Sequence, residues 1–126
     1  MKLKPQSQRV WVYRNLNPKR ERYSVQSREG VDYGRVIARA NYLTLKNCTF
    51  TVGSKGRQRV LEERRKNVHA GVLGTIVRSD KRRLDGAIRV SYNPYQSEHF
   101  VTAKGNVIHK ADFVIFTDHG VYVKGI

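Results

Sequence analysis

Cysteine is nearly absent from this sequence of 126 residues, in which Cys48 stands alone. A single cysteine forms no intramolecular disulfide, so the chain suits a reducing compartment. Cys48 lies in an apolar run, where a buried inert thiol fits better than a nucleophile. Long apolar runs are also missing: no stretch approaches the roughly 18 residues of a membrane span, and the amino terminus has no apolar signal region. We expect a cytoplasmic protein that is neither secreted nor membrane-spanning.

Catalytic and metal-binding patterns are scarce as well. The four histidines are spread over 50 residues without a cysteine or carboxylate at metal-ligand spacing. The 10 acidic residues fall mainly in turns or beside basic residues, so paired carboxylates for acid–base catalysis are missing. There is no glycine-rich phosphate loop. We expect no cofactor, no metal and no enzymatic activity; the alternative is a metal-free nuclease in which His69 acts on a phosphodiester held by Arg64 or Arg65.

Positive charge, in contrast, is abundant. Lys and Arg number 25 against 10 Asp and Glu, which gives a formal net charge of +15. A field of this sign attracts polyanions, and nucleic acid is the first candidate. Residues 1–66 carry 17 basic and 5 acidic residues, whereas residues 67–126 carry 8 and 5. We therefore expect the anion-binding surface in the amino-terminal half.

One segment has the composition of a helix. We predict a helix from about residue 55 to 66, with Ser54 as its N-cap, because good helix formers precede the β-branched alternation that begins at Val68. Two i,i+4 ion pairs define an ordinary solvated face. These pairs are Arg59–Glu63 and Glu62–Lys66.

The unpaired arginines of this helix lie beside its apolar edge. Arg57 and Arg64 fall one above the other on the helical wheel, next to Val60 and Leu61. In one interpretation, their stems cover apolar surface while the guanidinium groups reach water or an acidic partner. In the other, the two arginines are presented together to an anionic ligand.

The rest of the sequence alternates like β-strands, and the predicted fold is mostly β (α+β). The chain favours a strongly bent antiparallel sheet or a partly closed small barrel with one short helix covering one side. Residues 1–8 are predicted to be a flexible basic arm, and residues 9–126 a single β-rich domain. The strands are expected at 9–14, 22–26, 35–40, 42–52, 67–78, 87–92, 99–102, 106–109, 113–117 and 121–123.

Several local signals refine this picture. The apolar parity changes at Asn47, which indicates a bulge or bend. Gly71 and Gly74 interrupt a strand that is apolar on both faces, which indicates a central strand with sharp curvature or a close backbone approach. Residues 118–120 are typical of a three-residue hairpin loop ending in glycine.

Nucleic-acid contacts can be assigned to basic and aromatic side chains. Arginine and lysine at loop tips and on the helix reach phosphates, and Trp11 or Tyr13 are candidates for base stacking, with half-buried strand aromatics as the alternative. The candidate residues are Lys55, Arg57, Arg64, Arg65, Arg14, Arg20, Arg22, Lys81, Arg82, Arg83, Trp11 and Tyr13.

Three segments carry a family resemblance: Trp11–Leu16, Gly56–Val60 continuing through Lys66–Ala70, and Tyr92–Tyr95. Through them the chain resembles a group of small uncharacterised proteins encoded by phages and bacterial prophages. The resemblance implies a bacterial host cytoplasm, and it assigns no residue a role. The function we predict is non-enzymatic nucleic-acid binding, to DNA or RNA. The alternative is a phage-encoded anti-defence protein, similar to an anti-CRISPR, that binds a host protein or ribonucleoprotein.

Overall fold

The computed structural model of the chain describes residues 8–77 and 84–126, and within them one α-helix, one 3-10 turn and ten strands. Helix α1 is Ser54–Glu63 and the 3-10 turn is Gly30–Asp32. The strands are β1 (Arg9–Arg14), β2 (Tyr23–Ser27), β3 (Val36–Ala40), β4 (Leu43–Val52), β5 (Ala70–Val77), β6 (Ile88–Ser91), β7 (Phe100–Thr102), β8 (Val107–Ile108), β9 (Lys110–Thr117) and β10 (Gly120–Lys124).

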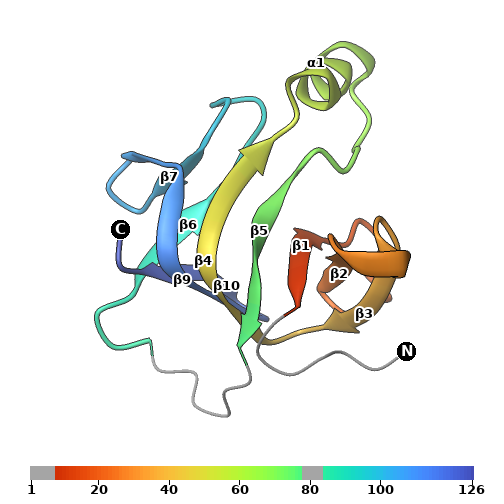
Figure 1. Cartoon of the computed structure of the whole chain (residues 1–126). Helices are drawn as coiled ribbons and strands as arrows, with labels where there is room; N and C mark the ends of the chain where they lie inside the picture. The colour runs from red at the N-terminus through yellow and green to blue at the C-terminus, as the bar shows by residue number, and fades with distance from the viewer. Residues whose placement is uncertain (1–7, 78–83) are drawn as a thin grey trace.

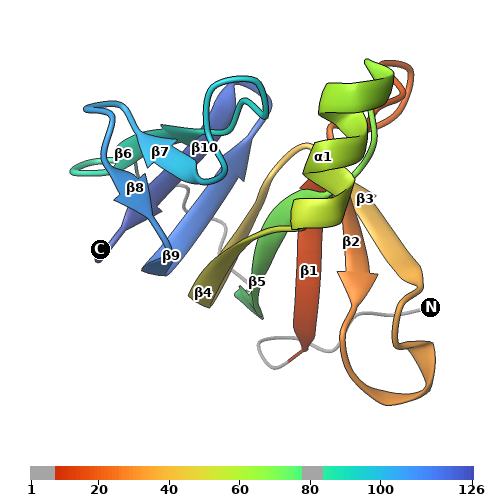
Figure 2. The ribbon, with the colours of Figure 1, turned by 90° about the horizontal axis from the view of Figure 1, so that it is seen from above.

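All ten strands belong to one antiparallel sheet, with the order β3-β2-β1-β5-β4-β9-β10-β6-β7-β8 (Figures 1 and 2). Within the residues that the structure describes, β3 and β8 each have one neighbour, so the sheet is open. It is nevertheless strongly bent, because Tyr23 of β2 donates a hydrogen bond of 2.7 Å from its hydroxyl to the carbonyl of Thr117 at the end of β9. The mostly β prediction is confirmed, in its bent open form.

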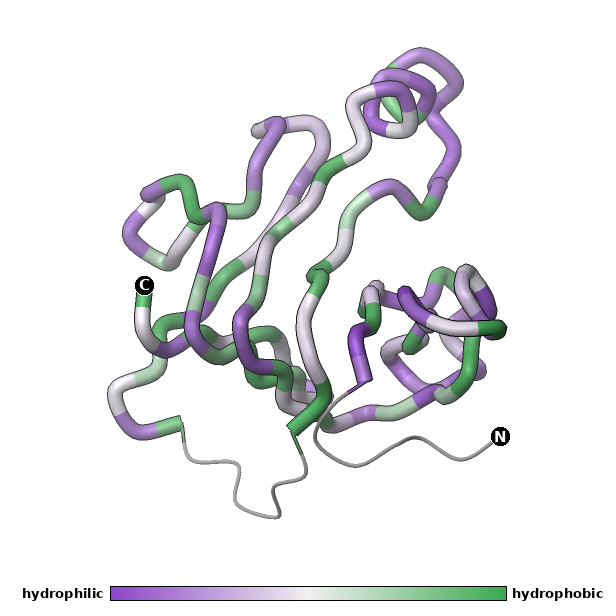
Figure 3. Tube along the Cα trace, in the orientation of Figure 1, coloured by the Kyte–Doolittle hydropathy of each residue, from purple (hydrophilic) through white to green (hydrophobic). Residues whose placement is uncertain are grey.

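Alternating apolar residues place the core on the inner face of the bend. Val10 and Val12 of β1 are fully buried, as are Leu45 of β4 and Val114 of β9. The residues between them on β1, Trp11 and Tyr13, lie on the other face and are half-buried, as expected for strands with a two-residue period. Figure 3 shows apolar positions concentrated in the strands, while α1 is mainly hydrophilic.

Helix α1 lies over one end of β4 and β5 instead of covering a face of the sheet (Figures 1 and 2). Only Val60 is buried among its residues. The predicted boundaries were wrong: the cap is Gly53, Ser54 already belongs to the helix, and the helix ends three residues early. Its end is set by Arg64, whose backbone is left-handed, with φ of 56°, a conformation that no longer continues a right-handed helix.

The early end of α1 changes two predicted relationships. The Arg59–Glu63 pair is present, with Nε and Oε2 3.7 Å apart. Lys66, however, lies beyond the helix, so it no longer stands one turn from Glu62. Arg64 is now the residue that caps the helix, with a left-handed backbone, and no longer a residue within it.

The bulge and the two strand glycines are confirmed. The β4–β5 register shifts between Lys46 and Thr49, and Asn47 has a φ of 52°. A methyl group on Gly71 would lie 2.5 Å from Cε2 of Trp11, and one on Gly74 would lie 3.0 Å from Cβ of Leu45. Glycine thus lets large side chains pack directly on the central strand.

The chain ends and hairpins differ from the sequence reading in detail. Gln8 is buried, and its carbonyl accepts a hydrogen bond from the backbone N–H of Ile76, so the folded part includes this residue. The rest of the predicted basic arm lies outside the described residues. Because Gly120 pairs with Thr117, the last hairpin loop has two residues, not three. No helix in the described part of the chain is long and apolar enough to cross a membrane.

Candidate nucleic-acid interface

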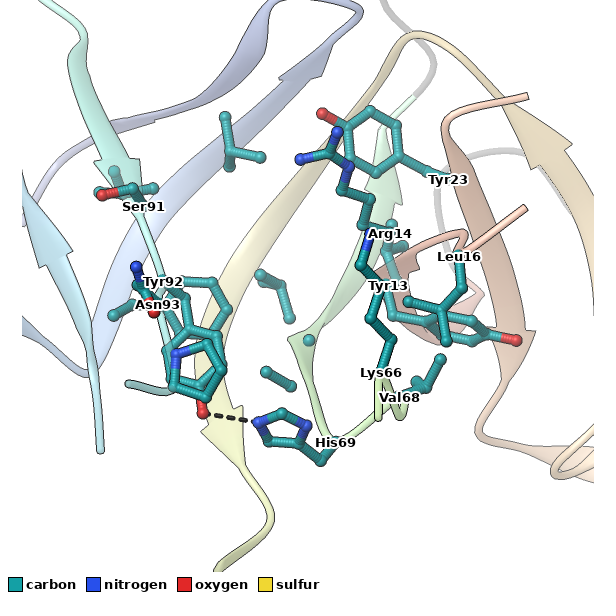
Figure 4. A pocket seen from close by; sticks show the side chains of 18 of the residues that line it. Tyr13, Arg14, Leu16, Tyr23, Lys66, Val68, His69, Ser91, Tyr92 and Asn93 are labelled. Carbon is teal, nitrogen blue, oxygen red and sulfur yellow. Dashed lines mark hydrogen bonds between the residues drawn. The ribbon is translucent and has the colours of Figure 1, made fainter. Parts of the chain in front are cut away.

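The bend leaves a cleft of about 660 Å³ on the inner side of the sheet, close to α1. One wall is formed by the end of β1 and the turn after it, and the opposite wall by β6 and the turn that follows. The start of β5, from Ala70 to Val72, contributes between them. Figure 4 shows Arg14 from one wall and Tyr92 from the other turned toward the space between them, while the ring of Tyr13 points away from it. We call this space the cleft.

Several basic side chains line the cleft. Five of its described lining residues are Lys or Arg, and none is Asp or Glu. Positive groups gathered in a concavity with apolar walls produce a stronger field than the same charges on an open surface. An anionic ligand is therefore favoured there. The five residues are Arg14, Arg22, Arg64, Lys66 and Arg89.

Arg22 is one of the five cleft cations and is only partly satisfied by its surroundings. Its Nε atom is buried and has no hydrogen-bond partner within the described residues. The neighbouring Tyr23 has its pKa raised by burial, while the charge of Arg22, a side-chain hydrogen bond with Arg22 and the charge of Arg14 act in the opposite direction. A buried guanidinium N–H without an acceptor is costly. An oxygen-rich ligand in the cleft would remove that cost.

Aromatic rings line the same space as the cations. Tyr92 of the turn after β6 packs against Phe100, with ring centroids 5.2 Å apart. Tyr95 is 59% exposed at the rim. Rings of this kind accept stacked nucleobases while nearby cations bind phosphates.

One hydrogen bond bridges the cleft. The carbonyl of Asn67 lies 2.8 Å from Nδ1 of His69, and because a carbonyl only accepts, this nitrogen carries the proton. In the neutral ring, Nε2 then accepts a 2.6 Å hydrogen bond from the hydroxyl of Tyr92, drawn as the dashed line in Figure 4. Burial raises the pKa of Tyr92. Both ring nitrogens of His69, the residue considered above for a metal-free nuclease, are thus engaged in hydrogen bonds within the protein.

Arg57 serves a structural role. Its Nε donates to the carbonyls of Pro94 and Ser97, at 3.0 and 3.1 Å, and Nη1 lies 3.7 Å from a carboxylate oxygen of Glu98. These contacts attach α1 to the turn that carries Tyr92 and Tyr95. The first interpretation gave this arginine water or an acidic partner; Glu98 is such a partner, and the two backbone carbonyls were not foreseen.

The remaining predicted residues are distributed over the molecule. Arg14, Arg22 and Arg64 come together at the cleft, whereas Trp11 and Tyr13 lie on the opposite face of β1, with ring centroids 5.0 Å apart. Lys55 and Arg20 are exposed away from the cleft, and Arg65 lies 3.2 Å from Glu63. Lys81, Arg82 and Arg83 lie outside the described residues.

Sequence reasoning missed Lys66 and Arg89 as cleft residues. Lys66 was placed on the solvated face of a helix that ends before it. Arg89 stands between Ile88 and Val90 on β6, and its Nη2 donates to the carbonyl of His119 at 2.9 Å. The alternation of β6 indicated an arginine on a strand, but not which wall the strand would form.

The fold and the cleft define a small basic protein with one bent open sheet and a concavity lined by basic residues and, among the described residues, by no Asp or Glu. Its sequence places it among phage proteins: residues 3–124 match the family of the Mycobacterium phage L5 gene 82 protein, and the chain belongs to this family. The gene 82 protein of Mycobacterium phage L5 is 38% identical to it over 122 residues, which cover 93% of this chain and 96% of that protein. No solved structure matches the chain. The phage resemblance seen in the sequence is confirmed.

Proposed function

We propose that this chain is a non-enzymatic nucleic-acid-binding protein that holds a single-stranded segment in its cleft, within the cytoplasm of the phage host. The observation that carries the proposal is the convergence of five basic side chains on a cleft lined by no described carboxylate. On an ordinary solvated surface, acidic side chains commonly neutralise the basic ones, as Glu63 does for Arg59 on α1. Phosphates are the biological anions that a polymer presents in series.

The dimensions and the aromatic lining favour unpaired nucleotides. A cleft of about 660 Å³ is in the size range of small-molecule sites, so it admits single nucleotides but not a duplex. Tyr95 offers a ring face for a base, and Arg14 and Arg64 offer charge for the backbone. The proposal therefore moves the interface from the helix surface to the cleft.

Fluorescence anisotropy with labelled single-stranded DNA, single-stranded RNA and duplex DNA tests this proposal. We expect the single strands to bind more tightly than the duplex. If all five cations neutralise a phosphate, the log–log salt slope approaches about −3.5, because each contact contributes about −0.7 for a single strand. Arg64→Glu should weaken binding at least about tenfold, since it reverses a charge at the cleft.

A matched control is Lys104→Glu, which makes the same charge change in the exposed turn between β7 and β8, outside the cleft. Its affinity should stay within about threefold of the wild type, because distant surface charges are screened. Equal losses in the two variants would show that only total charge matters and would refute a cleft-centred interface.

The second candidate is an anti-defence protein that binds a host protein or ribonucleoprotein. It is favoured by membership of a phage family and by exposed apolar residues next to the free edge strand β3, where Val31 is 98% and Val36 is 37% exposed. A tagged protein purified from host cells with and without nuclease treatment separates the two candidates. A stoichiometric protein partner that persists after nuclease treatment supports this second function, and its loss with the nucleic acid supports the first.

A further inference from the structure

A second carboxylate-free depression lies on the opposite face of the sheet, where Trp11 was placed away from the cleft. It has a volume of about 530 Å³, and its described lining includes two arginines and two large aromatics but no Asp or Glu. We call it the Trp11 groove. Its principal side chains are Arg9, Trp11, Arg28 and Tyr33.

Arg28 is held between two aromatic rings in this groove. Its guanidinium carbon lies 5.1 Å from the ring centroid of Trp11 and 5.6 Å from that of Tyr33. Trp11 is itself fixed, because its Nε1 donates to Oγ1 of Thr51 at 2.8 Å and its ring packs on Gly71. The two rings thus pack on the guanidinium and hold its orientation, which prepares its edge for bidentate recognition of a ligand.

The edge of the same guanidinium lacks acceptors. Within the described residues, the only side-chain hydrogen bond of Arg28 is a long one of 3.5 Å from Nη1 to the hydroxyl of Tyr33. Its Nε is buried with no partner among those residues. A guanidinium has five N–H donors, so most of them remain for a ligand.

A second arginine supplies charge beside Arg28. Arg9 lines the groove, and its Nη1 donates to the carbonyl of Asn47 at 3.0 Å and to Oγ1 of Thr75 at 3.4 Å. The bulge at Asn47 therefore fixes the position of this cation. Two fixed arginines without a carboxylate favour a ligand with two or more anionic oxygens, and a phosphate group meets that requirement.

We propose that the Trp11 groove is a second phosphate-binding site, which takes one nucleotide of a single-stranded polynucleotide with its phosphate on the edge of Arg28 and its base on the exposed ring of Tyr33. This inference rests on the proposed function. Tyr33 is 62% exposed, so the ring surface turned away from Arg28 is open to a base. A strand held here and in the cleft is bound on both faces of the sheet.

Trp11 is the only tryptophan of the chain, so its emission reports this groove. The probes are inorganic phosphate, adenosine monophosphate and an oligothymidylate of about 20 nucleotides, which exceeds common single-strand site sizes. We expect saturable quenching by the oligonucleotide at lower concentrations than by either small anion. Arg28→Gln should weaken oligonucleotide binding about tenfold and reduce the salt slope by about 0.7. Arg28→Lys keeps the charge but not the planar edge, so its affinity for the oligonucleotide should lie between those of the wild type and Arg28→Gln.

Two further variants separate this inference from the cleft proposal. Arg39→Gln removes the same charge from an exposed position on β3 and should change affinity less than about threefold. Arg64→Gln should weaken binding while leaving the Trp11 quenching at saturation unchanged. Tight oligonucleotide binding with unchanged affinity in Arg28→Gln and a flat Trp11 signal would overturn the groove but keep the cleft. Quenching by inorganic phosphate alone, with no oligonucleotide binding, would overturn both.

Discussion

The hydrogen bond between Tyr23 and Thr117 connects the two arms of the bent sheet, and Tyr23→Phe removes it with little other change. Tyr23 is 3% exposed, and its hydroxyl donates to the carbonyl of Thr117 at 2.7 Å. The ring itself packs edge-on against Phe116, with centroids 5.0 Å apart, and phenylalanine keeps this contact. The cost is therefore that of one buried hydrogen bond whose acceptor is left behind, about 1–2 kcal/mol.

Urea denaturation at pH 7 measures this cost. We expect a lower midpoint with an unchanged m-value, because the same surface becomes exposed on unfolding. Tyr95→Phe is the matched control, since it removes the same hydroxyl from a residue that is 59% exposed, and it should change the free energy of unfolding by less than about 0.5 kcal/mol.

Alkaline pH gives a second readout of the same bond. Burial raises the pKa of Tyr23 above 10.0, so the folded state retains the proton longer than the unfolded state. Its contribution to stability is complete below the ordinary tyrosine value and is lost as pH rises through the raised pKa. The difference between wild type and Tyr23→Phe should therefore shrink at high pH. Equal midpoints for Tyr23→Phe and Tyr95→Phe at pH 7 would refute the role of this bond in holding the bend.

Three other perturbations test further parts of the structure. Gly71→Ala should cost about 1–3 kcal/mol in denaturation experiments, because its methyl group would lie 2.5 Å from Cε2 of Trp11 and displace that ring. Burial raises the pKa of Cys48 to about 12, so the wild type should lose stability between about pH 9 and 12 with a slope approaching 1.4 kcal/mol per pH unit for this group, and Cys48→Ala should show a shallower loss. Arg57→Ala should lower the free energy of unfolding by about 1–2 kcal/mol, since two carbonyls lose their donor. Arg59→Ala, which removes an exposed ion pair, should lower it by less than about 0.5 kcal/mol. Similar values for the two variants would contradict the structural role assigned to Arg57.

The strands were predictable because their signals are local. The alternation of Val10 and Val12 with Trp11 and Tyr13 defines two faces of β1 regardless of its neighbours. The change of parity at Asn47 likewise identifies the bulge from the sequence alone. The helix end was misjudged because the left-handed backbone of Arg64 is unusual for arginine, and helix propensity gives no sign of it.

The candidate site was only partly predictable, because it is assembled from distant segments. Arg14 and Arg89 stand 75 positions apart in the sequence and meet at the cleft only through the bend of the sheet. Charge counting pointed to the amino-terminal half of the chain, which contains Arg14 and Arg22 of the cleft. It gave no means of separating Arg64, at the cleft, from Arg57, whose guanidinium is committed to backbone carbonyls.

The strand order has a bearing on how the molecule is made. Strand β9 lies between β4 and β10 in the sheet, so β4 has no partner on that side until residues 110–117 have left the ribosome. Leu43 must then find Phe116, a partner 73 positions away, and pairing over such separations is slow compared with local hairpin formation. During synthesis β4 therefore keeps an unpaired edge until β9 is available, and such an edge can pair with another chain.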